Sequence, residues 1–189
     1  SMEFIKFAKK YWGINEIQLL PTGQYYMKGE KCPIYSGSSM EFGNHMINTD
    51  MFQIDRNLKN VVPSNQDNGK IDYKNIITPT STHENSLKNL YKNMPSELKD
   101  EFIGFKSCLS KRLEAKSIYH ALKDIYGSSD INSWSIIDRE LYNKEIVTEN
   151  ERIHRISKIK NSKKKIVDFY LFKQFLAEKS VKAAAEELH

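Results

Sequence analysis

The chain has 189 residues, of which 39% are hydrophobic and 28% are charged, and its formal net charge is +5. This composition is that of an ordinary soluble domain, and no run approaches the roughly 20 apolar residues of a membrane-spanning helix. Two cysteines are too few for a disulfide framework, so we expect a reducing compartment and a cytoplasmic location.

The N-terminal segment predicts one helix followed by extended chain. Apolar residues at helical spacing favour a helix over residues 3–12, and Gly13 is placed to end it because glycine accepts a left-handed backbone. Residues 14–27 indicate strand or extended structure around a turn at residues 21–23. From residue 28 to 93, small and polar residues recur and helical periodicity is absent until about His83.

Helical patterns dominate after residue 95. One apolar series continues from residue 98 to 113, and a second helix is expected at residues 115–126 before Gly127. A third helix, capped by Asp130 or Ser133, would carry Trp134, Ile137, Leu141 and Tyr142. A last helical region is expected over residues 149–189.

The two cysteines suggest no structural zinc, because zinc needs about four ligands and the chain has no Cys-x-x-Cys pair. Cys108, flanked by Phe105 and Leu109 in a helical pattern, is expected to be a buried small apolar residue.

Polar residues between positions 50 and 90 suggest a metal site. Asp55 follows an apolar strand pattern, Asn75 falls in a loop, and His83 with Asn85 lies where a helix begins. If these side chains converge, their oxygen and nitrogen atoms suit one hard divalent cation, Mg²⁺ or Mn²⁺. Such an ion can stabilise the leaving oxygen of a phosphodiester while an activated water attacks. Each residue alone is equally compatible with an ordinary turn or helix cap.

Four short motifs occur in order over residues 30–95: Cys32-Pro33-Ile34-Tyr35-Ser36-Gly37, Ile54-Asp55-Arg56 running on to Val62-Pro63-Ser64, Asn75-Ile76-Ile77, and Asn85-Ser86-Leu87-Lys88-Asn89. Their order resembles the HNH, or ββα-metal, nuclease family, and specifically the HNH domain of the CRISPR RNA-guided nucleases. The resemblance covers roughly a third of the chain.

The resemblance implies an α+β fold, in which a small ββα-metal core precedes a mainly helical C-terminal half. It divides the chain into an HNH-like module at residues 1–95 and a helical region at 96–189. Asp55, His83 and Asn85 would hold the ion and Asn75 would orient the site. Arg56 stands where the family has its catalytic histidine; because arginine keeps its proton it is no general base, so His83 or His45 would replace it.

The basic residues suggest nucleic acid, preferably DNA, as the partner. A positive surface attracts polyanions, although a solvated basic face explains the same charge. Contacts to phosphate are expected from Arg56, Lys88, Lys158, Lys160, Lys163 and Lys164. The neighbouring aromatic stripe of Phe169, Phe172, Phe175 and Leu176 has helical spacing and is expected in the core.

Two functions therefore compete at the level of sequence. The first is a metal-dependent nucleic-acid endonuclease, or a degenerate HNH-like binding module. The second is a non-catalytic helical interaction protein, such as an accessory of a defence or mobile-element system. Metal-dependent DNA cleavage that is lost in Asp55→Ala distinguishes the first from the second.

Overall fold

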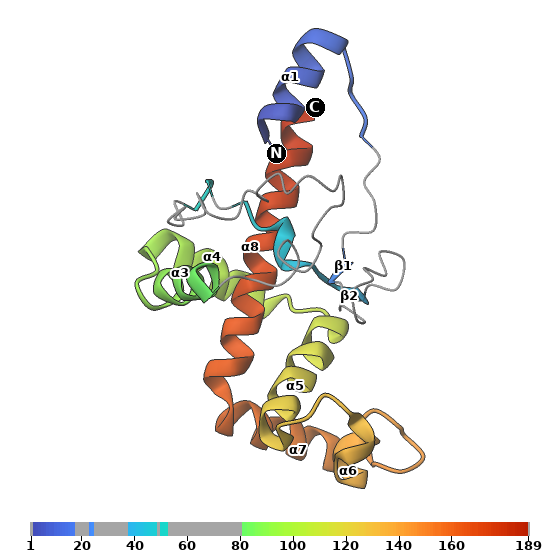
Figure 1. The fold of residues 1–189 in the computed structure, drawn as a ribbon. Coiled ribbons are helices and arrows are strands. Elements are labelled where there is room, and N and C mark those ends of the chain that lie inside the picture. Colours follow the sequence, from blue (N-terminus) through green and yellow to red (C-terminus); the bar gives the residue numbers. More distant parts are fainter. Residues whose placement is uncertain (1, 18–22, 25–37, 49, 53–80, 189) are drawn as a thin grey trace, which may run out of the picture. The chain divides into compact units, whose positions relative to one another are not determined.

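The computed structural model describes residues 2–17, 23–24, 38–48, 50–52 and 81–188. This part is mostly helical (Figure 1). Its helices are α1 (Met2–Trp12), α3 (Ser81–Lys92), α4 (Ser96–Ser107), α5 (Lys111–Tyr126), α6 (Ile136–Arg139), α7 (Glu149–Ser162) and α8 (Lys164–Leu188), with 3-10 turns at Asn44–Met46 and Ile131–Ser133. Within these ranges, no helix is both long and apolar enough to cross a membrane.

The described strands form one small antiparallel pair. β1 (Gly23–Gln24) pairs with β2 (Ser38–Phe42), with an irregular register between Gly23 and Gln24. The expected helical C-terminal half is confirmed. Most of the expected ββα-metal core, at residues 30–95, lies outside the described residues.

The chain divides into two compact units. The first unit comprises residues 1–105 and 172–189, and the second comprises residues 106–171, so α8 contributes residues to both. The functional division expected from sequence, at residue 95, stays a prediction.

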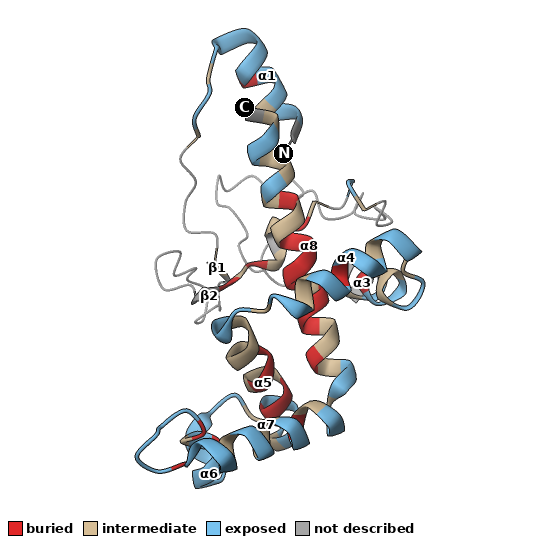
Figure 2. Cartoon of the chain, turned by 180° about the vertical axis from the view of Figure 1, so that it is seen from behind, coloured by how far each residue is buried: buried red, intermediate tan, exposed pale blue. Residues whose placement is uncertain are grey.

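The core of the first unit is an aromatic cluster between α3, α4 and α8. Phe172 is fully buried, and its ring centroid lies 5.3 Å from that of Tyr91 and 5.5 Å from that of Phe102. Phe175 adds a contact to Phe102 at 5.6 Å, and Leu176 is also fully buried. Figure 2 shows this burial along α8. The expectation that this stripe forms core is therefore confirmed for Phe172, Phe175 and Leu176.

Two buried polar residues of α8 hold the segment that follows β2. The amide of Gln174 accepts from Phe42 N at 2.8 Å and donates to Phe42 O at 3.0 Å. Ser180 Oγ accepts from Asn48 N at 2.9 Å and donates to Leu176 O at 2.8 Å. Because buried polar groups are costly when unpaired, these bonds explain why Gln174 and Ser180 are tolerated in a buried position.

In the second unit, side-chain caps determine where the helices begin. Ser110 Oγ accepts from Leu113 N at 3.3 Å at the start of α5, and the helix ends at Gly127, whose φ is 62°. Thr148 and Glu151 form a reciprocal capping box at the start of α7. Each cap satisfies an amide that has no partner within its helix.

Several expected elements differ from those observed. The apolar series over residues 98–113 is interrupted after Ser107, because Ser110 starts a new helix. Asp130 caps only the 3-10 turn Ile131–Ser133, and α6 is instead capped by Ser135. The region 149–189 is two helices, separated at Lys163. Cys108 lies at the interruption and is exposed, so its expected burial is wrong.

A buried carboxylate joins α5, α6 and α7. Asp138, only 3% exposed, accepts hydrogen bonds from Arg155 and from Tyr126 Oη at 2.7 Å. Trp134 stacks on Tyr126 with a centroid separation of 5.6 Å and donates from Nε1 to Ser128 O at 3.1 Å. These contacts fix the short α6, which is too brief to be stable alone.

Candidate functional site

The candidate site is built on α1, a short helix with a defined end. Gly13 has a φ of 63°, in the left-handed region that glycine adopts without strain. Its amide donates to Lys9 O at 3.2 Å, which satisfies one of the last carbonyls of the helix. The helix and terminator expected from sequence are therefore confirmed.

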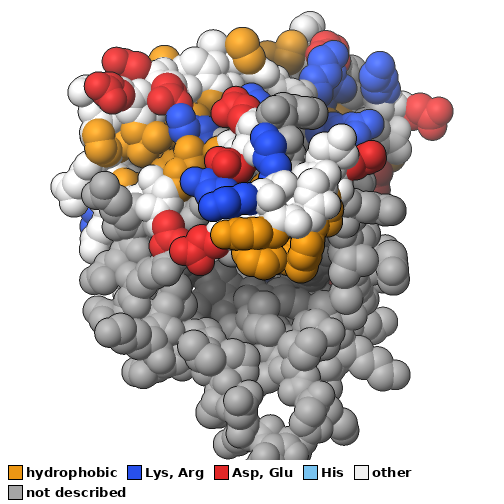
Figure 3. Space-filling view, turned by 90° about the horizontal axis from the view of Figure 1, so that it is seen from above, with side chains coloured by type: hydrophobic (Ala, Val, Ile, Leu, Met, Phe, Trp, Pro, Cys, Tyr) orange, Lys and Arg blue, Asp and Glu red, His pale blue; other side chains and the backbone are white. Residues whose placement is uncertain are grey.

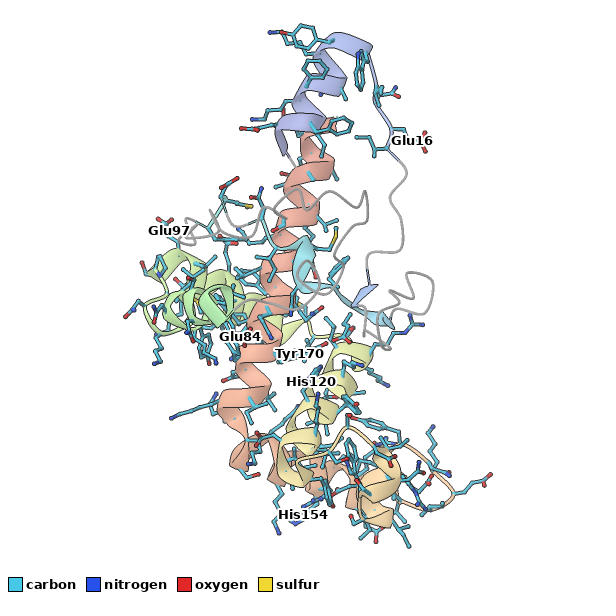
Figure 4. All side chains as sticks on the ribbon, in the orientation of Figure 1. Glu16, Glu84, Glu97, His120, His154 and Tyr170 are labelled. Carbon is cyan, nitrogen blue, oxygen red and sulfur yellow. The ribbon has the colours of Figure 1, made fainter. Side chains whose placement is uncertain are left out.

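Four aromatic side chains of α1 are exposed: Phe4 (51%), Phe7 (46%), Tyr11 (62%) and Trp12 (60%). Phe4, Phe7 and Tyr11 recur at intervals of three and four residues and so share one stripe of the helix, with Trp12 beside them. We call these four residues the aromatic surface of α1. In the stick view (Figure 4), side chains project outward from α1.

The rings of the aromatic surface contact one another at defined angles. The Phe7 and Tyr11 centroids are 4.7 Å apart with 39° between the ring planes. The Trp12 ring lies edge-on to both phenyl rings, at 75° to Phe4 and 88° to Phe7, over 6.1 and 5.3 Å. Such edge-to-face pairs are favourable, so the rings hold one another in a preferred arrangement.

Within the first unit, α1 contacts the end of α8. Ala8 is fully buried, whereas the residues on either side of it are exposed. Lys9 Nζ donates to Glu187 O at 3.0 Å, and Lys6 lies 3.7 Å from the Glu187 carboxylate at the end of α8. This contact leaves the four large rings exposed, and contiguous exposed apolar side chains are typical of binding surfaces.

Charged groups lie beside the aromatic surface of α1. Lys10 Nζ lies 5.1 Å from the Tyr11 centroid, a cation–π distance. Seen from above (Figure 3), hydrophobic side chains lie at the surface among Lys, Arg, Asp and Glu side chains.

Only part of the metal site expected from sequence lies within the described residues. Asp55, Arg56 and Asn75 fall outside them. His83 and Asn85 belong to the first turns of α3, where Asn85 is exposed, and His45 belongs to the 3-10 turn Asn44–Met46. The expected Mg²⁺ or Mn²⁺ ion and its ligand set therefore stay predictions.

The described part of the chain brings few acidic and histidine side chains together. No three His, Cys, Asp or Glu side chains gather there as a metal site would require. Glu16, Glu84 and Glu97 lie apart in Figure 4, while the His120 ring stacks on Tyr170 with centroids 4.5 Å apart.

Most of the lysines expected to contact phosphate are paired within the protein. Lys160 lies 2.5 Å from Glu114, Lys163 lies 2.8 Å from Asp124, and Lys164 pairs with Asp168. Lys158 and Lys88 are exposed. Paired lysines add less positive potential than the sequence count suggests.

Comparison with known proteins identifies the family. The model of glycoside hydrolase family 77, described as 4-alpha-glucanotransferase, matches residues 1–189. The chain belongs to this family. Neither the curated proteins nor the solved structures contain a match to it.

This family assignment corrects the nuclease interpretation. The resemblance to HNH nucleases is wrong, and with it the expected endonuclease or nucleic-acid-binding function, because the family match covers the whole chain and names a carbohydrate-active class. The interaction-protein alternative has no support either. The resemblance depended on short motifs of Asn, Ser, Gly and Pro, which are common wherever the backbone turns.

Proposed function

We propose that this chain binds α-glucans, the substrates named by its family, and that the aromatic surface of α1 is the binding site. The observation that carries the proposal is the exposure of four aromatic rings on one short helix, each between 46 and 62%. The family match supplies the ligand class.

The chemistry of sugars and aromatic rings supports this assignment. One face of a glucose ring presents mainly C–H groups, which carry partial positive charge and pack against the negative face of an aromatic ring. The hydroxyl groups at the edge of the sugar need polar neighbours. Lys10 Nζ, which lies over the Tyr11 ring, and the Tyr11 hydroxyl are polar groups of this kind beside the rings. Since a glucan is uncharged, stacking rather than ion pairing is the main attraction.

The proposal covers the binding of the glucan and leaves out the cleavage of its glycosidic bonds. Breaking a glycosidic bond generally requires two carboxyl groups that flank it. Asp138, the most deeply buried described carboxylate, is held by Arg155 and Tyr126 and is therefore structural. The proposal accordingly concerns how the glucan is held.

Affinity electrophoresis of the purified chain in gels containing amylose tests the proposal. We expect the gel to retard the unaltered chain and to retard Trp12→Ala or Phe7→Ala much less. Tyr142→Ala is the matched control, because Tyr142 is an aromatic residue of similar exposure, 47%, outside α1. Equal migration of the unaltered chain with and without amylose would contradict the proposal.

A further inference from the structure

We propose that the aromatic surface of α1 pairs with the same surface of a second copy of this chain, and that the two helices run antiparallel. The inference goes beyond the proposed function and stands without it. A two-fold contact uses the same patch on both copies, so the patch must be complementary to itself in shape and in charge.

The apolar stripe of α1 has the spacing of helices that pair with each other. Phe4, Phe7 and Tyr11 follow one another by three and four residues, which is the spacing of the two apolar positions in the seven-residue repeat of coiled coils. Each of the three side chains is between 46 and 62% exposed. The Phe7 and Tyr11 rings contact each other, so the stripe is continuous there. These rings are placed to form the apolar centre of a helix pair.

The charges beside the stripe determine the direction of the pair. Helical geometry places the buried Ala8 on one side of the stripe, and the exposed Glu3 and Lys10 together on the other side. Glu3 and Lys10 are seven residues apart, about 10.5 Å along the helix, which is too far for an ion pair within α1. An antiparallel pair centred near Phe7 brings Glu3 of each copy beside Lys10 of the other. A parallel pair directs both charges toward the Ala8 side of the second copy.

The antiparallel contact therefore has an apolar centre and a charged edge. Two Glu3–Lys10 pairs border the rings, and charges in this position set the orientation of paired helices. Lys10 Nζ already lies beside the stripe, 5.1 Å from the Tyr11 centroid. Because α1 has only 11 residues, the contact is small, and we expect a weak dimer that forms as the protein concentration rises. A bound glucan uses the same rings and competes with the second copy.

Sedimentation velocity of the full chain tests the inference, at concentrations from about 1 μM to about 1 mM, which span the affinities of weak dimers. We expect the sedimentation coefficient to rise with concentration toward that of a dimer. Phe7→Ala should weaken dimerisation at least about tenfold, because it truncates the central ring. The control is Ile153→Ala, which alters an apolar residue of the second unit that is 58% exposed, and it should change the dimerisation constant less than about twofold.

Exchanging the two charges separates an antiparallel pair from a general apolar contact. Glu3→Lys sets two lysines side by side, and Lys10→Glu sets two glutamates side by side, so each variant should weaken the dimer about fivefold. The double variant, Glu3→Lys with Lys10→Glu, restores both pairs with their charges exchanged. It should return the dimerisation constant to within about twofold of the unaltered chain. Recovery in the double variant also establishes that α1 still folds.

Each outcome decides a separate point. A chain that stays monomeric over the whole concentration range overturns the inference, and so does a dimer that Phe7→Ala leaves unchanged. A double variant as weak as the single variants overturns the antiparallel direction. None of these results concerns glucan binding, which retardation by amylose reports separately. A chain that dimerises as expected and ignores amylose contradicts the proposed function alone.

Discussion

Arg155 holds the buried carboxylate of Asp138 with two hydrogen bonds, from Nε to Oδ1 over 2.7 Å and from Nη2 to Oδ2 over 2.5 Å. The Asp138 side chain is fully buried and that of Arg155 is 28% exposed. A two-point contact of this kind fixes both side chains in orientation as well as distance. It therefore links α6 to α7.

Replacing Asp138 with alanine should destabilise the second unit by about 3 kcal/mol, because removing one partner leaves the other charge poorly compensated. Urea unfolding followed by circular dichroism measures the change. The control is Arg139→Ala, which removes only the more exposed pair with Glu140 and should cost less than about 0.5 kcal/mol. Equal losses in the two variants would contradict the structural role of Asp138.

Acid should destabilise the protein partly through Asp138. Burial raises the pKa of this carboxyl, but hydrogen bonds from Arg155, Tyr126 and Ser135, together with the Arg155 charge, outweigh burial and lower the pKa below 3.8. A lowered pKa in the folded state means that the stabilisation is present above about pH 4 and is lost as the pH falls through the folded-state pKa. Thermal unfolding between pH 6 and pH 2 should show this loss, and Asp138→Asn should show a smaller one.

Two glycines should respond to alanine in opposite directions. Gly127 ends α5 at a φ of 62°, where a Cβ is strained, so Gly127→Ala should cost about 1 kcal/mol. Gly104 lies within α4 and has open space around it, so Gly104→Ala should stabilise by about 0.5–1 kcal/mol through helix propensity. Chemical unfolding of both variants checks the signs. A stabilising Gly127→Ala would show that the left-handed turn is absent.

Phe172→Ala should be the most damaging single change in the first unit. Its ring is fully buried between Tyr91 and Phe102, and truncating such a residue costs about 3–5 kcal/mol. Ile103→Ala on α4 is the control, because Ile103 is 52% exposed and should change stability by less than about 1 kcal/mol. A loss below 1 kcal/mol for Phe172→Ala would contradict the aromatic core.

The predictable elements are those with a strong local pattern. The backbone freedom of glycine predicts the helix ends at Gly13 and Gly127. Helical spacing predicts the buried stripe that includes Phe172 and Phe175. The interruptions at residues 108–110 and at Lys163 contain neither glycine nor proline. They depend on the Ser110 cap and on tertiary packing, which override the continuous apolar series.

The candidate site was harder to predict than the helix that carries it. Periodicity places Phe4, Phe7 and Tyr11 on one stripe, and such a stripe usually faces the core. Here the buried residue is the small Ala8, so the large rings remain outside. Which side of a helix is covered depends on its neighbours in space. Four aromatic residues within nine positions were the available signal.

Gln174 gives the short β2 strand an unusual neighbour. Its side-chain amide both accepts from and donates to the backbone of Phe42, as an adjacent strand would do. An open strand edge is a template for pairing between molecules. At Phe42 both backbone groups are already bonded to Gln174, so another molecule cannot pair with this residue of β2 without displacing the glutamine.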